Sequence, residues 1–273
     1  MKAKLIVVFV LLAVLVSACG GGGAAPFPAK ADPATAVPTA LSAPINVQTE
    51  VPTLEVVPTQ KPDSSCAEYG TEEFDTPNEC WDLNKVFEIV TKGLTIPPEA
   101  AQITLNNGAL NFTFPYDNTT SKYDLYYYFF NDANQYADVV VEADVQALKD
   151  SKLNHAFSLA CRVTDAGWYE ARVTTSGLYW IYQYDRQLRL ADKNPFVEIA
   201  KGATVKMYPK VEIMNNIRME CVGDTITLKV NNAKVWSGQI RRPQPGSVGI
   251  GFNTFPGSYP VYALIERVTL SKP

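Results

Sequence analysis

Short segments in which apolar and polar residues alternate constrain the fold of this chain more than any other feature. In residues 137–147 (ADVVVEADVQA) every second residue from Val139 to Val145 is apolar, whereas Glu142 and Asp144 lie on the opposite phase. Because side chains of a strand alternate between two faces, such a segment buries one face and exposes the other. The pattern recurs, separated by turn residues, over 155–163, 168–174, 178–184, 216–222, 224–230, 247–252 and 261–270. Many short strands at this spacing predict an all-β antiparallel sandwich or barrel.

Two segments carry more detailed expectations. In residues 155–163 the alternation predicts that Phe157, Leu159, Cys161 and Val163 point into the core. Residues 82–92 (DLNKVFEIVTK) instead place apolar residues at helical spacing, so we expect at most a short helix there.

The N-terminus has the three-part form of a secretory signal. Lys2 and Lys4 precede the apolar run 5–16, which ends in small residues directly before Cys19. This run is shorter than the roughly 20 apolar residues that a spanning helix needs. The sequence Val-Ser-Ala-Cys at 16–19 resembles the lipobox of bacterial lipoproteins, in which lipid is attached to the cysteine after residues 1–18 are removed. The resemblance implies an extracytoplasmic protein, lipid-anchored at Cys19 to a bacterial membrane at the cell surface. The alternative is an ordinary signal peptide followed by an incidental cysteine.

Residues 19–65 form a segment of different composition. Four glycines follow Cys19, prolines recur up to Pro62, and Phe27 is the only aromatic residue, so no core can form there. We expect a disordered, proline-rich linker. It either acts as a stalk of about 3.1 Å per residue where it is polyproline-like, or has no spacing role.

Residues 66–273 form the expected folded domain, and four stretches carry a resemblance to a known fold. They are FSLACRVTDAGWYEARVTTSGLYWIYQYD (157–185), NNIRMECVGDTITLKVNNAKVWSG (215–238), GSVGIGF (246–252) and IERVTL (265–270). Their order resembles that in laminin-G-like and concanavalin A-like lectin/glucanase jelly rolls of bacterial surface proteins. The resemblance implies an antiparallel β-sandwich, but a fold shared by many proteins specifies no single function.

The same resemblance bears on metal binding. Some such domains bind calcium near their last strand, where related sequences often read Phe-Asp-Asn-Val. Here the matching residues are 265–268 (Ile-Glu-Arg-Val), and Arg267 would place a positive charge beside such an ion. We therefore expect no cofactor, with calcium as the alternative.

Four cysteines remain in the expected domain. An even number in an exported chain favours two disulfides. Of the three connectivities we expect Cys66–Cys80, which closes a short loop, and Cys161–Cys221, whose members both lie on the apolar phase of their strands. The alternative for the second pair is two buried free thiols.

Several function classes are disfavoured by composition. The net charge is −4 and Arg241-Arg242 is the only adjacent basic pair, which argues against nucleic acid as a partner. A single histidine and the lack of a CxxC pair argue against a zinc site. Jelly-roll glucanases carry Glu-x-Asp-x-Glu on one strand, and Glu142 and Asp144 approach this pattern without a third carboxylate. We therefore expect no catalytic residues, and a glycoside hydrolase is the less favoured alternative.

Aromatic and charged residues on the predicted outer strand faces suggest binding. Rings that share a face can stack on sugars, while charged side chains bond hydroxyl groups. We expect a carbohydrate-binding surface, with a surface protein and an envelope-assembly role as the alternative. A further alternative is that the rings pack beneath a loop or against residues 123–130. The candidate ligand-binding residues are Trp168, Trp180, Tyr182, Tyr184, Arg162, Arg172, Glu142 and Glu170.

Overall fold

The computed structural model describes residues 66–77, 79–81, 83, 87–89, 96–116, 118, 120–241 and 244–273. The expected signal peptide, the expected lipidation site Cys19 and the expected linker lie outside the described residues, and so do residues 82, 84–86 and 90–92 of the expected helix. Within the described part of the chain, no helix is long and apolar enough to cross a bilayer.

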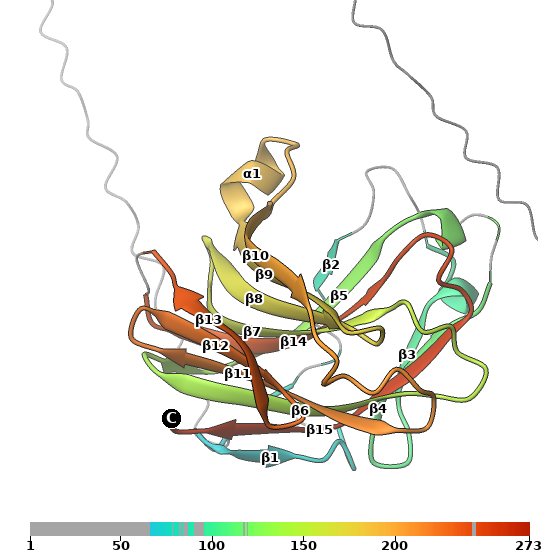
Figure 1. Ribbon diagram of the computed structural model, residues 1–273, viewed down its shortest axis with the longest axis horizontal. Coiled ribbons are helices and arrows are strands. Elements are labelled where there is room, and N and C mark those ends of the chain that lie inside the picture. Colours follow the sequence, from blue (N-terminus) through green and yellow to red (C-terminus); the bar gives the residue numbers. More distant parts are fainter. Residues whose placement is uncertain are drawn as a thin grey trace, which may run out of the picture. The chain divides into compact units, whose positions relative to one another are not determined.

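The fold is an antiparallel jelly-roll β-sandwich of two sheets (Figure 1). Sheet A contains, in spatial order, β13 (Ala233–Gln239), β12 (Thr225–Val230), β11 (Met214–Val222), β6 (Val139–Ala147), β15 (Val261–Ser271), β4 (Leu110–Phe114) and β3 (Gln102–Leu105), with β1 (Gly70–Glu72) also paired to β15. Sheet B contains β10 (Phe196–Ala203), β9 (Leu178–Asp185), β8 (Gly167–Thr174), β7 (Ala156–Thr164), β14 (Gly246–Thr254), β5 (Leu125–Tyr136) and β2 (Phe87–Ile89). The short helices are η2 (Pro98–Ala100), η3 (Thr120–Lys122) and α1 (Arg186–Leu190). The predicted fold class is confirmed.

The expected helix is wrong for residues 87–89. They form strand β2, which pairs with β5 at the edge of sheet B, Phe87 opposite Tyr128. The helical spacing of the apolar residues is a local signal. An unpaired sheet edge, in contrast, presents free backbone N–H and C=O groups, and residues 87–89 pair with those of β5. Tertiary pairing outweighs the local preference here.

The core lies between the two sheets and follows the predicted alternation. Val141 and Ile217 from sheet A and Leu159 and Phe252 from sheet B are all 1% exposed or less. Their polar neighbours in sequence turn to the outer faces, as the two-residue period requires.

Both expected disulfides are present. Cys161 on β7 and Cys221 on β11 join sheet B to sheet A through the core, with their Cα atoms 6.7 Å apart. Cys66 and Cys80 join two segments near the N-terminal end of the sandwich, with a Cα separation of 5.7 Å. The alternative of free thiols is therefore wrong.

Strand β7 departs from regular alternation at Arg162. Its φ angle is 55°, in the left-handed region, and the pairing of β7 with β8 shifts register between Cys161 and Thr164. A bulge of this kind turns the following side chain to the other face. Val163 therefore packs with Ala160 on the outer side of sheet B, and its predicted inward direction is wrong.

Candidate functional site

The outer face of sheet B is strongly concave. Strands β5 and β10 are separated in the sheet by β14, β7, β8 and β9, a distance of about 24 Å in a flat sheet with strands about 4.8 Å apart. The rings of Tyr126 on β5 and Phe196 on β10 nevertheless have centroids 5.2 Å apart. The sheet therefore curls until side chains from opposite ends meet, and we call this outer side the concave face.

The centre of the concave face is a buried carboxylate. Glu170 on β8 has no exposed surface. Its Oε2 accepts hydrogen bonds from the Tyr128 hydroxyl (2.8 Å) and Trp168 Nε1 (3.3 Å). Its Oε1 accepts one from Arg172 Nε (2.8 Å), and Ser158 Oγ lies 2.8 Å from the same oxygen. A carboxylate buried in this way must have its accepting sites filled, and these neighbours fill them.

Electrostatics hold the central groups in defined protonation states. Burial, together with the charge of Glu170, raises the pKa of Tyr128 well above its ordinary value, so its hydroxyl remains a donor. Burial alone would lower the pKa of Arg172, but the Glu170 carboxylate outweighs it and the net shift is upward. The guanidinium of Arg172 therefore stays protonated, and its 2.8 Å ion pair with Glu170 is buried.

Three aromatic rings cover the guanidinium of Arg172. Its Cζ atom lies 4.8 Å from the ring centroid of Tyr126, 4.9 Å from that of Tyr182 and 4.6 Å from that of Phe196. These distances are within the range of cation–π attraction. Burial raises the pKa of Tyr126 to about 12, so its hydroxyl is neutral. All three rings remain partly exposed, and they form the surface above the ion pair.

A second group of rings forms the floor at the neighbouring end of this face. Trp168 and Tyr184 are stacked at 3.8 Å between centroids, and both are buried. Phe130 lies against Trp168 at 5.3 Å and is partly exposed. A Cβ atom at Gly249 would lie 2.5 Å from the Phe130 ring, and one at Gly251 would lie 2.8 Å from a ring carbon of Tyr128. The glycines of β14 thus let the rings of β5 lie flat on the sheet.

Six of the eight predicted binding residues share the concave face, with unequal exposure. Trp180 and Tyr182 are partly exposed. The other four are buried, and the segment 123–130 packs on them, as one alternative anticipated. The buried residues are Trp168, Glu170, Arg172 and Tyr184.

The remaining two predicted residues lie elsewhere. The bulge at Arg162 directs its guanidinium to the end of the sandwich, where Nη2 donates to the carbonyl of Gly223 at 2.7 Å. Glu142 lies on β6, on the outer face of sheet A, and not on the concave face of sheet B. Arg162 and Glu142 therefore do not share a surface with Trp180, and this part of the prediction is wrong. Alternation alone predicts neither the bulge in β7 nor the assignment of β6 to sheet A.

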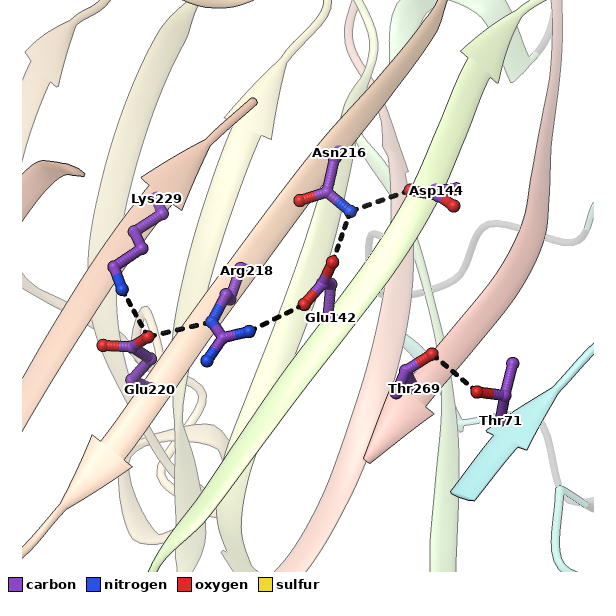
Figure 2. A network of polar contacts seen from close by, with 8 residues as sticks. All are labelled: Thr71, Glu142, Asp144, Asn216, Arg218, Glu220, Lys229 and Thr269. Atoms are coloured by element: carbon purple, nitrogen blue, oxygen red, sulfur yellow. Dashed lines mark hydrogen bonds and ion pairs between the residues drawn. The ribbon is translucent and has the colours of Figure 1, made fainter. Parts of the chain in front are cut away.

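Glu142 and Asp144 belong to a chain of polar contacts across sheet A (Figure 2). Asn216 Nδ2 bridges their carboxylates at 2.8 Å each, and Arg218 Nη1 pairs with Glu142 at 3.0 Å. Arg267, at the position where the similar domains often have asparagine, pairs with Asp144 at 2.5 Å. Lys229 and Glu220 extend the chain, with Glu220 bonded to both Lys229 and Arg218. Each of these carboxylates is thus held by a cation, an amide or both.

Three partly exposed ring residues of the concave face are missing from the predicted set: Tyr126, Phe130 and Phe196. The first two lie in the segment YDLYYYFF (123–130), whose aromatic residues occupy both strand phases and so conceal which ring faces outward. The paired glycines at alternate positions of β14 are the signal that could have revealed them, since two glycines on one strand face leave room for flat rings.

Metal ligands do not converge in the described part of the chain. Groups of three or more His, Cys, Asp or Glu side chains placed to hold an ion are absent from it.

Comparison with known proteins identifies the fold alone. No family model matches the chain, and no curated protein matches it in sequence. A lichenase from a mouse hindgut metagenome superimposes with a TM-score of 0.51 at 12% identity, covering 75% of this chain and 99% of that one. A β-glucanase of Bacillus licheniformis gives 0.49 at 12% identity (76% and 99% covered), and the carbohydrate-binding module CBM66 of Bacillus subtilis gives 0.42 at 15% (57% and 90%). The chain therefore has a jelly-roll β-sandwich fold, which different proteins use for unrelated functions.

Proposed function

We propose that the protein is a lipid-anchored, extracytoplasmic carbohydrate-binding lipoprotein that binds glycans at the concave face without hydrolysing them. The observation that carries the proposal is the gathering of partly exposed rings from three strands of one curled sheet. They are Tyr126, Phe130, Trp180, Tyr182 and Phe196.

These rings suit a sugar ligand. Flat aromatic faces pack against the apolar C–H faces of a sugar ring, and the hydroxyls of Tyr126 and Tyr182 can bond its polar edge. The buried pair of Glu170 and Arg172 fixes the positions of the rings from beneath. A surface held in this way loses little conformational entropy on binding.

The state of the carboxylates supports a non-catalytic role. Glycoside hydrolysis needs two carboxyl groups, about 5 to 9.5 Å apart, that face the scissile bond. Glu170 is fully buried and its oxygens are engaged, and Glu142 and Asp144 lie on the other sheet. Asp124, just before β5, is a half-buried carboxyl whose pKa is raised by burial, and Glu198 on β10 is an exposed residue opposite Tyr182. A hydrolase mechanism would have to use these groups.

A glycan array of the mature protein tests the binding proposal. Tyr182→Ala should weaken binding about tenfold, since removal of one stacked ring costs about 1 to 1.5 kcal/mol. Trp180→Ala should act in the same direction. Tyr116→Ala is the matched control, because this tyrosine is 65% exposed and follows β4, a strand of the other sheet.

Two results would overturn the proposal. If no glycan binds, the favoured alternative is a surface protein as the ligand. If a polysaccharide is hydrolysed and Asp124→Asn or Glu170→Gln abolishes hydrolysis, the protein is an enzyme.

The anchor is tested by mass and fractionation. Intact mass of detergent-extracted protein should show loss of residues 1–18 and acylation at Cys19, because each buried CH2 of an acyl chain contributes about 0.8 kcal/mol and several chains give stable anchoring. Cys19→Ala should move the protein to the soluble fraction; retention in the membrane fraction would contradict the claim. The two disulfides support export, since such bonds persist in oxidising compartments.

A further inference from the structure

A cleft of about 380 Å³ opens beside the stacked rings of Trp168 and Tyr184 on the concave face. It lies between the β7–β8 turn and the residues that lead into β14. Two arginines, Arg162 and Arg241, line it together with the amides of Gln183 and Gln244 and the stacked pair Trp168–Tyr184. Its size falls within the range of small-molecule sites, which begins at about 300 Å³.

Arg162 is a buried cation fixed mainly by neutral groups. Its side chain is 5% exposed, and its guanidinium donates to the carbonyls of Gly223 at 2.7 Å and Gln244 at 3.3 Å. Among the described residues, the carboxylate paired with it is that of Asp138, at 3.5 Å and half exposed. Its Nε atom is buried without a hydrogen-bond partner in the described part of the molecule. Buried polar groups are normally satisfied, so this arginine, which lines the cleft, retains an N–H donor that no described residue uses.

The second cation, Arg241, is exposed and also lines the cleft. The hydroxyl of Tyr169 donates to its backbone carbonyl and so fixes the main chain there. The described lining of the cleft contains these two arginines and neither aspartate nor glutamate. In a chain of net charge −4, the charged side chains in the described lining of this cleft are therefore both cationic.

We propose that the cleft binds a sugar that carries a carboxylate, such as a hexuronic acid unit. A planar guanidinium is suited to two parallel bonds with a carboxylate, and Arg162 and Arg241 would supply these donors. Gln183 and Gln244 offer both donors and acceptors to the hydroxyls, and the Trp168–Tyr184 pair offers a flat wall. This site goes beyond the proposed function, because its ligand is an anion and its determinants are separate from Trp180 and Tyr182.

The test compares D-glucuronate with D-glucose as ligands of the mature full-length protein, by calorimetry and ligand-observed NMR. Glucuronate should bind and glucose should not. Arg241→Gln should weaken glucuronate binding about tenfold through loss of one charge-assisted pair. Lys149→Gln, an exposed cation on the loop after β6, is the matched control and should change nothing. Raising NaCl from about 0.05 to about 0.5 M should weaken binding severalfold through screening.

Further variants distinguish the possible outcomes of this test. Arg162→Lys should retain part of the affinity and Arg162→Gln should lose it, and circular dichroism reports whether each variant is folded. Trp180→Ala should leave glucuronate binding intact, so failure of the concave-face proposal is distinguishable from failure of this one. The inference is overturned if glucuronate does not bind, if Arg241→Gln binds as well as the natural protein, or if inorganic sulfate binds as tightly as glucuronate.

Discussion

His155, the only histidine of the chain, is an example of a residue whose chemistry is set entirely by its surroundings. It is fully buried, with the rings of Phe157 and Phe252 at centroid distances of 5.6 and 5.3 Å. Nδ1 lies 3.0 Å from the carbonyl of Lys152, so the neutral ring donates its proton there. Burial lowers the pKa of His155 to about 4, against a smaller opposing effect of that carbonyl.

This burial predicts a loss of stability in acid. The unfolded chain takes up the histidine proton below about pH 6.5, whereas the folded protein takes it up only near pH 4. The unfolded state therefore binds more protons in this window, and the free energy of unfolding falls by up to about 3 kcal/mol as the pH drops from 6.5 to 4. Urea unfolding at several pH values should show this loss in the natural protein and a shallower one in His155→Phe. Equal losses in both proteins would contradict the assignment.

At the scale of elements, strand β14 shows how backbone composition controls the concave face. Gly249→Ala places a methyl group within 2.5 Å of the Phe130 ring, and the carbonyl of Phe129 lies 3.1 Å away on the same side. We expect a loss of about 1 to 3 kcal/mol from overpacking, measured by urea unfolding. Adding Phe130→Ala removes the clash, so the double variant should lose less than the sum of the two single variants. Strict additivity would show that the ring and the glycine do not interact.

Element positions could be predicted from the sequence where a segment carried its own two-residue pattern. Strand β6 shows this, because Val139 to Val145 are apolar at every second position and lie in the core. Two failures have local causes. The three residues of β2 are too few to show a period against the helical spacing around them, and the left-handed φ of Arg162 is a bulge that alternation cannot anticipate.

At the scale of the whole molecule, the candidate site depends on the curl of sheet B. Sequence correctly placed Trp168, Glu170 and Arg172 on one outer face of their strand, which would be solvated if the sheet were flat. These residues are covered by Tyr126 on β5, about 45 residues earlier in the sequence, and by Phe196 on the edge strand β10. Contacts between strands as far apart in the sheet as β5 and β10 have no local signature in the sequence. The burial of Glu170 could therefore not be deduced from the sequence.

The disulfide between Cys161 and Cys221 acts at this same scale, because it ties the two curved sheets together through their shared core. It spans 60 residues of sequence, which corresponds to about 4 kcal/mol of loop-closure entropy removed from the unfolded chain. A Cys161→Ala/Cys221→Ala variant should lose about this much free energy of unfolding in urea.

The second disulfide complicates a test with reductant, so that test should use the Cys66→Ala/Cys80→Ala variant as its background. In that background dithiothreitol can act only on the pair that joins the sheets, and it should reproduce the loss once unfolding exposes the buried sulfurs. If reductant shifts the unfolding free energy of this background by less than about 1 kcal/mol, the sheets are held together by packing and not by the cross-link.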